Sequence, residues 1–326
     1  KWVTVGNAKV YYADKKMLNW KKTKNLICNI DFDILYLNSF FSYKDSILPI
    51  ILYKINRIPN KKVIVAPRGQ FSDGALGLKS FKKKLYIKIS KALGLYSGIT
   101  WHATNGREKE EIQGVFGNDI SIHIARNLTP NYQKISYDKN IVKKSGELKL
   151  VYISRIHPMK NLYQILKILR GFNDNIEFNI YGPIEDKNYW SKCEKLIDEL
   201  SDNIVVNYNG TILNAEVNRI YKRNHVAILL TLGENFGHAI SEALIGGCPV
   251  LISDRTPWRN LERYNVGWDL PLENSTLISE KIKKFVEMDN EEYMKMSKNA
   301  FLYGKSKSNE SGDFLSYNEM LNNCKY

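Results

Sequence analysis

The feature that most constrains the fold is a regular alternation of short apolar runs and amphipathic stretches in the second half of the chain. The apolar runs, which we expect to be strands, cover residues 148–154, 176–181, 204–208, 226–230 and 248–253. Stretches with apolar residues at helical spacing lie between them. The last of these ends at Gly246-Gly247, a common signal for the end of a helix. This order predicts a parallel sheet with helices on both faces.

The first half repeats this order, and a polar, lysine-rich stretch at 131–147 separates the two halves. Expected strands cover residues 9–13, 33–38, 63–67, 99–104 and 120–125, with helical stretches that include 47–55 and 79–93. Because 326 residues exceed the usual size of a single core, we expect an α/β protein of two doubly wound, Rossmann-like domains whose parallel sheets face a cleft. We place the domains at 1–140 and 147–300, with a C-terminal helix in 301–326 that returns to the first domain.

The positive charge of the chain is concentrated in its first half. The net charge is +14, and residues 1–146 hold 26 Lys and Arg against 10 Asp and Glu, a balance of +16. The remaining residues hold 22 against 24, a balance of −2. This asymmetry predicts an anionic partner for the first half: a membrane surface, a phosphorylated acceptor or nucleic acid. A lysine-rich surface that reflects a biased composition is an equally good interpretation.

Other bulk features favour a cytoplasmic location. The sequence has no uninterrupted apolar stretch of about 18 residues, and residues 1–16 are too polar for a secretion signal. Four widely separated cysteines form no C-x-x-C pair, which argues against a zinc site or a disulfide framework and fits a reducing compartment. We expect a cytoplasmic protein, either free or peripheral on the inner face of the membrane.

A pair of carboxylates in residues 230–244 carries the clearest functional signal. Glu234 is expected on a loop after a buried strand, and Glu242 lies about one turn into the next helix, which should begin near Gly237. A helix start favours an anion such as phosphate, and a carboxylate can accept hydrogen bonds from both hydroxyls of a vicinal diol. Spacing alone favours a plainer interpretation, a helix with an acidic first turn.

This segment resembles the E-x-x-x-x-x-x-x-E element of the retaining GT-B glycosyltransferases of the large family 4 group, the glycosyl transferases group 1. The match includes Phe236-Gly237 after the first glutamate and, after the second, Ala243-Leu244, Gly247 and Pro249-Val250. The resemblance implies that Glu234 contacts the donor sugar and that Glu242 binds the nucleotide ribose. It also implies further donor-binding positions at Asn235, Phe236, Gly237, His238 and Gly210.

A second element, residues 154–161, is similar to the R-x-x-x-x-K loop of the same family. Arg155 and Lys160 follow an expected strand and precede an expected helix, with Ser154 where the family usually has glycine. The resemblance implies that this loop neutralises the donor diphosphate. Arg155 can bind phosphate oxygens in a bidentate manner, Lys160 adds a point charge, and both would stabilise the departing nucleoside diphosphate.

The first half resembles a subgroup of that family around 66–76 and 101–112. The resemblance implies acceptor-side positions at Arg68, Gly69, Asp73 and His102. Arg68 would bind an acceptor phosphate or assist the leaving group, and the alternative is a surface arginine before a glycine turn. For His102 the alternative is a purely structural histidine. The strand, glycine-rich loop and helix that usually open the family are missing, so at least one βαβ unit should precede Lys1, or this domain is reduced.

Two further patterns in the sequence carry weaker signals. Asp31 and Asp33 spell D-x-D, which binds metal in GT-A enzymes, but here it precedes a strand, so we interpret it as a strand-entry turn and expect no metal. In helix 79–93, apolar residues at four-residue spacing lie among lysines. This pattern fits a stripe that faces the core or a basic amphipathic helix on an anionic membrane. The core-facing interpretation is the commoner one.

These resemblances imply a retaining glycosyltransferase that moves a hexose-type sugar from a nucleoside diphosphate, UDP by default and GDP as the alternative. The acceptor would be a glycan or lipid-linked molecule in cell-surface polysaccharide biosynthesis. No residue stands out as a covalent nucleophile, which implies a front-face mechanism without metal or cofactor, the nucleotide-sugar being a co-substrate. Two alternatives are a nucleotide-sugar epimerase of the same fold and a non-catalytic nucleic-acid-binding module. The two glutamates with Arg155 and Lys160 argue against both, so we do not expect nucleic acid as a partner.

Overall fold

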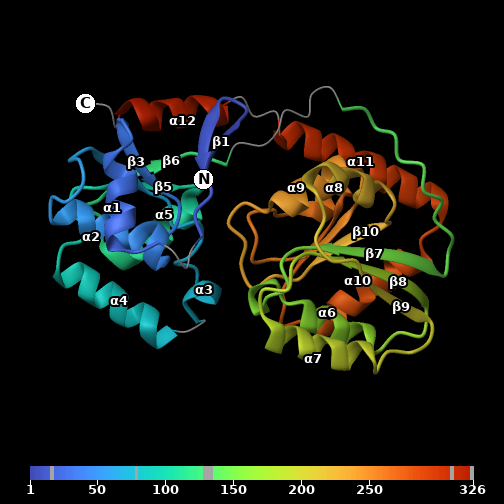
Figure 1. Cartoon of the computed structure of the whole chain (residues 1–326). Coiled ribbons are helices and arrows are strands. Elements are labelled where there is room, and N and C mark those ends of the chain that lie inside the picture. The colour runs from blue at the N-terminus through green and yellow to red at the C-terminus, as the bar shows by residue number, and fades with distance from the viewer. Residues whose placement is uncertain (15–17, 78–79, 128–134, 309–311, 324–326) are drawn as a thin grey trace. The chain divides into compact units, whose positions relative to one another are not determined.

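The chain folds into two compact units, each built on its own parallel sheet. The computed structural model describes residues 1–326 except 15–17, 78–79, 128–134, 309–311 and 324–326. The first unit comprises Lys1–Asn127 with Gly312–Tyr326, and the second comprises Leu128–Ser311 (Figure 1). The boundaries thus fall at 127 and 311, whereas the sequence placed them near 140 and 300.

The second unit contains a six-stranded sheet in which every neighbouring pair is parallel. Its strands are β7 (Glu147–Ile153), β8 (Asn175–Tyr181), β9 (Ile204–Tyr208), β10 (Val226–Leu229), β11 (Val250–Ser253) and β12 (Gly267–Leu270). Their order is β12-β11-β10-β7-β8-β9, so the chain winds outwards from β7 in one direction and then from β10 in the other. This is the doubly wound arrangement, with its topological switch point between β7 and β10.

Helices cover both faces of this sheet because the side chains of each strand alternate between two cores. Tyr152 of β7 packs into one core with α6 (Leu162–Leu169), α7 (Lys187–Ile197) and α10 (Ser275–Glu287). Val151 packs into the other core with α8 (Asn214–Lys222), α9 (His238–Ile245) and part of α11 (Asn290–Ser308). The two helix layers lie above and below the strands in Figure 1. Short 3-10 turns form η2 (Pro158–Lys160) and η3 (Leu261–Tyr264).

Two buried lysines attach residues 135–146 to the second unit. Lys139 Nζ donates to two carbonyls at the end of α8, at 2.7 and 3.1 Å, and Lys143 Nζ donates to two carbonyls at the end of α10, at 3.0 and 3.1 Å. The last carbonyls of a helix lack partners within it and carry partial negative charge, so each ammonium group stabilises a helix end. The stretch expected to be a linker is therefore packed from residue 135 onwards, while 131–134 lie outside the described residues.

The first unit contains a four-stranded parallel sheet in the order β3-β4-β5-β6. The strands are β3 (Ile34–Leu37), β4 (Lys62–Val65), β5 (Thr100–Ala103) and β6 (Ser121–Ile124). Val63 and Val65 face a core rich in aromatic rings, whereas Ile64 between them contacts Met320 on the opposite face. The helices are α1 (Trp20–Cys28), η1 (Tyr43–Ile47), α2 (Leu48–Lys54), α3 (Asp73–Gly77), α4 (Ser80–Ala92), α5 (Gly106–Phe116) and α12 (Gly312–Asn323).

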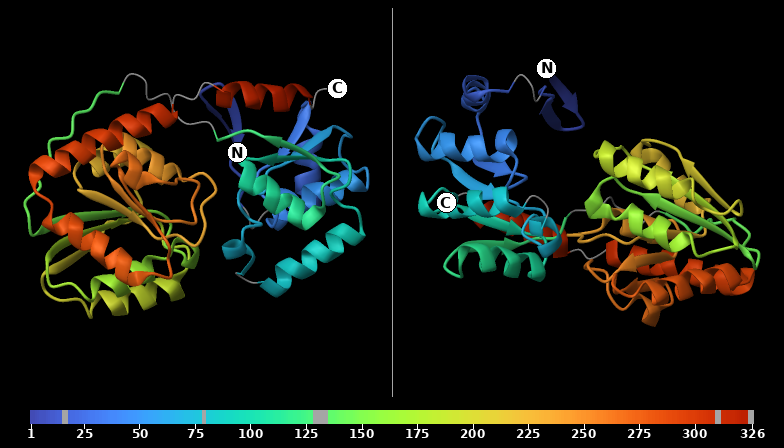
Figure 2. Two further views of the ribbon diagram at one scale, coloured as in Figure 1. Left: turned by 180° about the vertical axis from the view of Figure 1, so that it is seen from behind. Right: turned by 90° about the horizontal axis from the view of Figure 1, so that it is seen from below.

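The structure corrects the expectation for residues 9–13. These residues belong largely to β2 (Ala8–Tyr11), which pairs antiparallel with β1 (Trp2–Val5) in a separate hairpin, and Figure 2 shows this hairpin apart from the four-stranded sheet. Val5 pairs with Ala8, so the turn is the two-residue segment Gly6-Asn7. Gly6 has φ +58, the conformation that two-residue hairpin turns require. The Gly-Asn pair was thus the hairpin signal in the sequence.

The structure also corrects the expectation that the apolar stripe of helix 79–93 faces the core. Phe81, Leu85, Ile89 and Leu93 are all exposed, whereas Ser90 is buried and Tyr86 and Ile87 pack against the core. No helix among the residues that the structure describes is long and apolar enough to cross a membrane.

Candidate functional site

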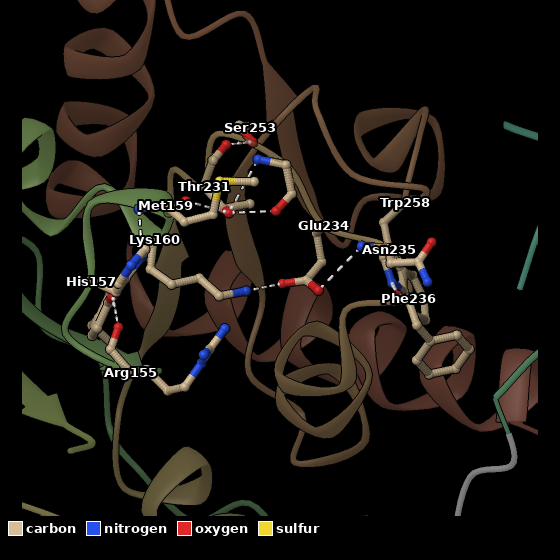
Figure 3. A network of polar contacts seen from close by, with 12 residues as sticks. Arg155, His157, Met159, Lys160, Thr231, Glu234, Asn235, Phe236, Ser253 and Trp258 are labelled. Atoms are coloured by element: carbon tan, nitrogen blue, oxygen red, sulfur yellow. Dashed lines mark hydrogen bonds and ion pairs between the residues drawn. The ribbon is translucent and has the colours of Figure 1, made fainter. Parts of the chain in front are cut away.

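The loops that follow β7 and β10 meet through an ion pair at the switch point of the second sheet. Lys160 Nζ lies 2.5 Å from Glu234 Oε2, and the two side chains point toward each other in Figure 3. Their side chains are 12% and 20% exposed, so the pair is largely shielded but still reachable from solvent. In open α/β sheets, ligands bind outside the carboxyl ends of the strands at such a point.

Hydrogen bonds to the backbone of Met159 hold the Lys160 loop in place. His157 Nδ1 accepts a hydrogen bond from Met159 N at 3.1 Å and so caps the short helix η2. The Met159 carbonyl accepts from the Thr231 hydroxyl and from Leu232 N, both at 2.9 Å. The loop after β7 is therefore fastened directly to the chain that leaves β10, which fixes Lys160 opposite Glu234 (Figure 3).

The Glu234 loop is held from the β11 side as well. Ser253 at the end of β11 donates its hydroxyl to the Thr231 carbonyl at 2.6 Å, and Glu234 N donates to the Arg255 carbonyl at 3.1 Å. Asn235 N donates to Glu234 Oε1 at 3.3 Å. One carboxylate oxygen of Glu234 thus contacts Lys160 and the other contacts its own loop, which orients the carboxylate.

Gly237 is the N-cap of α9, as the sequence predicted, and its backbone needs glycine. Its φ is +81, and a Cβ there would lie 2.9 Å from Trp258 Nε1 and 2.9 Å from Ile240 Cδ1. Trp258 Nε1 donates to the Phe236 carbonyl at 2.7 Å, which fixes the entry into the helix. The His238 ring lies beside that of Phe236, with centroids 4.5 Å apart. The predicted donor-binding positions 235–238 thus form a turn, fixed by these contacts, at the N-terminus of α9. The N-terminus of a helix is electrostatically favourable for an anion.

Arg155 lies at the same edge of the sheet, on the solvent side. Its Nη1 donates to both carboxylate oxygens of Glu185, at 2.9 and 3.2 Å, and the two side chains are 55% and 39% exposed. The Tyr152 hydroxyl donates to the Arg155 carbonyl at 3.2 Å, which fixes the backbone while leaving the guanidinium in solvent. Exposed ion pairs contribute little to stability, so a phosphate can compete for this guanidinium at small cost.

Glu242 lies in the first turns of α9 and is half-buried. Burial raises the pKa of its carboxyl above the usual range because the charged form is poorly solvated there. Its carboxylate makes no hydrogen bond to any side chain or backbone group in the part of the chain that the structure describes. It can therefore accept hydrogen bonds from a ligand.

Gly210 follows β9, two strands away from β7. Its carbonyl accepts a hydrogen bond from Gly182 N at 2.8 Å, so it ties the end of β9 to the loop that leads from β8 to Glu185. No hydrogen bond or ring contact joins it to Lys160 or Glu234 among the described residues. The structure therefore places Gly210 on the same edge of the sheet as the ion pair, but not in contact with it.

In the first unit, Arg68 is the centre of a polar network at the carboxyl ends of the strands. Its Nε donates to Asn38 Oδ1 at 2.6 Å, its Nη2 donates to the Tyr36 hydroxyl at 2.8 Å, and its Nη1 donates to Asn127 Oδ1. The Tyr36 hydroxyl in turn lies 2.5 Å from His102 Nδ1. Arg68, which is half-buried, thus links the ends of β3, β4 and β6.

His102 and Gly69 also belong to this internal network. His102 Nε2 contacts the Ala125 carbonyl at 2.7 Å, and burial lowers the pKa of this buried histidine, which favours the neutral ring. Gly69 N donates to Glu108 Oε1 at 2.6 Å, and Thr104 N donates to Glu108 Oε2 at 2.8 Å. The remaining acceptor-side candidate, Asp73, begins α3, and its side chain lies outside the described residues.

Several residues of these networks carried no signal in the sequence. Glu185 and Trp258 stand outside the recognised motifs. Their contacts join different strand-end loops, so only the folded sheet brings them to the site. Asn38 follows a strand, a position where a polar side chain could have been noticed. No group of three or more His, Cys, Asp or Glu able to hold a metal occurs among the residues that the structure describes.

Comparison with solved structures identifies proteins that share this architecture. A TarM variant from S. aureus in complex with fondaparinux, alpha-GlcNAc-glycerol and UDP is 18% identical, with a TM-score of 0.61 over 81% of this chain and 51% of TarM. Sucrose-phosphate synthase from Thermosynechococcus elongatus is 12% identical, with a TM-score of 0.69 over 96% and 80%. Anabaena HepE in complex with UDP and glucose is 14% identical, with a TM-score of 0.68 over 93% and 81%. This chain thus spans about half the length of TarM, and the likeness shows a GT-B fold.

The sequence itself supplies the family. No curated protein sequence matches the chain significantly. The profile of the family described as "Glycosyl transferases group 1" matches residues 133–302, which is more than half of the chain and includes both the Arg155–Lys160 loop and the Glu234–Glu242 segment. The chain therefore belongs to the glycosyl transferases group 1, a family of glycosyltransferases with the GT-B fold.

Proposed function

We propose that the chain transfers a hexose-type sugar from a nucleoside diphosphate donor to a glycan or lipid-linked acceptor, with retention at the anomeric carbon. The observation that carries this proposal is the Lys160–Glu234 ion pair at the switch point of the second sheet. It combines a cation for a phosphate with a carboxylate for a sugar hydroxyl. The neighbouring N-terminus of α9 adds backbone N–H groups for the diphosphate.

Each predicted residue then has a role that fits its surroundings. Lys160 and Arg155 would hold the diphosphate oxygens, since both lie in the loop between β7 and α6. Glu234 would accept hydrogen bonds from the donor sugar hydroxyls. Glu242 would accept hydrogen bonds from the ribose hydroxyls; its side chain is half-buried, which raises the pKa of its carboxyl. A hydroxyl pair gives Glu242 the hydrogen bonds that favour its charged form.

The transfer proceeds on one face of the sugar. The bond from the anomeric carbon to the diphosphate oxygen breaks, and its electron pair stays on that oxygen. The acceptor hydroxyl oxygen forms the new bond from the same side, and its proton passes to the leaving phosphate. Lys160, Arg155 and the α9 N-terminus stabilise the charge that grows on the diphosphate, so the proposal requires neither a metal nor a cofactor.

UDP-sugars are the favoured donors, with GDP-sugars as the alternative. The TarM and HepE structures, which share the fold, were obtained with UDP. We assign the acceptor to cell-surface polysaccharide biosynthesis and the enzyme to the cytoplasm or the inner face of the membrane, consistent with the basic first half of the chain.

A thermal-shift screen with UDP-, GDP- and ADP-sugars tests the donor site. One nucleotide family at about 100 times its Kd should stabilise the protein by about 2.7 kcal/mol, which raises Tm by roughly 5 °C. Glu242→Ala should abolish this shift, whereas Glu280→Ala, an exposed carboxylate on α10, should retain it. Absence of a shift with every donor, or an equal shift in Glu242→Ala, would reject the proposed donor site.

Product analysis distinguishes glycosyl transfer from epimerisation of the donor sugar. Incubation of the stabilising UDP-sugar with a lipid or glycan acceptor should release UDP and form a glycoside whose anomeric configuration, read by NMR, equals that of the donor. An epimerase would instead convert the donor sugar without an acceptor and release no UDP. An inverted glycoside would contradict the front-face mechanism.

A further inference from the structure

The face of α4 that points away from the first unit combines apolar and basic side chains. Phe81 is 79% exposed and Leu93 is 67% exposed, with the exposed Leu85 and Ile89 between them at four-residue spacing. Residues 80–92 contain five lysines and no acidic residue. We call the four apolar residues and the exposed lysines Lys82, Lys84 and Lys88 the α4 surface.

The orientation of this surface is fixed by the back of the helix. The Tyr86 hydroxyl lies 2.7 Å from that of Tyr96, and Ser90 is fully buried with its hydroxyl bonded to the Ile87 carbonyl at 2.9 Å. Lys83 Nζ bonds to a carbonyl of α3 and lies 5.2 Å from the centre of the Phe41 ring. Since α4 packs through Tyr86, Ile87 and Ser90, it cannot turn its apolar stripe inwards without losing these contacts.

We propose that the α4 surface docks on an anionic phospholipid bilayer. A helix that lies in the plane of the interface buries its apolar stripe among the acyl chains while its lysines meet the headgroups. The α4 surface provides both parts on one side of a helix, and the first half of the chain carries the excess positive charge of +16. The proposal extends the lipid-linked acceptor of the proposed function, but bilayer binding does not depend on catalysis.

Two other occupants fit this surface less well. A second copy of the chain would bring two sets of lysines together, because a symmetric contact places the same surface against itself. Nucleic acid would attract the lysines but would give the aliphatic side chains Leu85, Ile89 and Leu93 no partner, since it offers mainly phosphates to such a surface. A bilayer satisfies both kinds of side chain.

Co-sedimentation of the full chain with sucrose-loaded vesicles tests the proposal. Vesicles of phosphatidylcholine with about one third phosphatidylglycerol should bind the protein at low salt, whereas phosphatidylcholine alone should not. The double variant Phe81→Ser and Leu93→Ser should weaken binding at least about tenfold. Lys84→Gln with Lys88→Gln should also weaken it about tenfold or more, since each lysine near an anionic surface contributes about fivefold.

Leu302→Ser is the matched control, because Leu302 is an apolar residue of α11 that is 53% exposed in the second unit. It should bind vesicles as the wild type does. Each variant should keep the thermal midpoint and nucleotide response of the wild type, which separates a loss of docking from misfolding or from failure of the donor site. Failure of the wild type to bind anionic vesicles, equal binding by the α4 variants, or self-association that disappears with Phe81→Ser would each overturn the proposal.

Discussion

The carboxyl ends of the two parallel sheets bear polar clusters that differ in how far their side chains are hydrogen-bonded within the protein. In the first unit, the Arg68 guanidinium donates hydrogen bonds to Asn38, Tyr36 and Asn127. The carboxylate of the buried Glu108 accepts hydrogen bonds from two backbone N–H groups. In the second unit, the Arg155 guanidinium is bonded only to an exposed glutamate among the described residues. The Glu242 carboxylate accepts no hydrogen bond within the part of the chain described. Every guanidinium nitrogen of Arg68 is bonded within the protein, whereas the second cluster retains capacity for a ligand.

The topology of the sheets accounts for this difference. The described strands of the first unit follow one another as β3-β4-β5-β6, whereas the second sheet reverses between β7 and β10. At a reversal the two loops turn to opposite faces and leave room between them. The Lys160–Glu234 pair lies at that point. We infer that the Arg68 network is mainly a scaffold and that the second sheet carries the reacting groups.

The largest effect that this comparison predicts is on catalysis by Lys160. Lys160→Met removes a cation that would stabilise the leaving diphosphate, so kcat should fall about 10²–10³-fold while the thermal midpoint changes little. UDP release in the presence of acceptor measures this rate. Lys167→Met, an exposed lysine on the following helix α6, should stay within about twofold of the wild type. A normal rate for Lys160→Met would remove the ion pair from the proposed mechanism.

The corresponding change in the first unit should act on stability instead. Glu108→Ala leaves the N–H groups of the half-buried Gly69 and the buried Thr104 without acceptors, at a cost of about 3 kcal/mol in the free energy of unfolding. Urea denaturation measures this cost. Glu110→Ala, an exposed position on the same helix α5, should change stability by less than about 0.5 kcal/mol. Equal effects of the two substitutions would contradict a scaffold role for this network.

The comparison also shows which parts of the molecule could be read from the sequence. Lys160 and Glu234 were predictable because their segments resemble two motifs of a known family, and the adjacency of β7 and β10 follows from double winding. Glu185 and Trp258 were not, because hydrogen-bond partners from separate loops leave no periodic pattern. Arg68 and His102 were candidates from the sequence, but their bonds to Tyr36 and Asn38 were not predicted, since the members of this network come from different strand ends.

Helical periodicity has a similar limit in α4. The four-residue spacing of Phe81, Leu85, Ile89 and Leu93 predicted a helix, and the helix is present. The same spacing cannot say which face the rest of the fold covers. Here the contacts of Tyr86, Ile87 and Ser90 decided the orientation, and the most apolar stripe lies outside.

His225 is a buried histidine directly before β10, at the opposite end of this strand from the Glu234 loop. Its Nδ1 accepts from Lys149 N at 2.9 Å, and burial lowers its pKa to about 3. The unfolded chain, with an ordinary pKa of about 6.5, binds more protons between these values, so stability is lost as pH falls. The loss between pH 6.5 and 5 should be about 1.5 kcal/mol.

His225→Asn keeps an acceptor for Lys149 N but does not titrate in this range, so it should flatten the pH dependence. Urea denaturation of wild type and variant at several pH values isolates the contribution, because all other groups are common to both. His102 of the first unit, whose pKa is also lowered, should add a slope of the same sign that His225→Asn leaves in place. Parallel curves for wild type and variant would assign the acid sensitivity elsewhere.

The smallest expected effect concerns Glu185, the partner of Arg155. Because the pair is exposed, Glu185→Gln should change stability by less than about 0.5 kcal/mol. It frees the guanidinium, so UDP should bind equally well or up to about threefold more tightly by calorimetry, whereas Arg155→Met should weaken UDP about tenfold. Glu199→Gln frees Arg170 from a similarly exposed pair of 3.1 Å in the same unit and should leave UDP affinity unchanged. Weaker UDP binding by Glu185→Gln would show that the donor site needs the intact Arg155–Glu185 pair. Arg155 would then have a structural role, like that of Arg68 in the first unit, and would not bind the diphosphate.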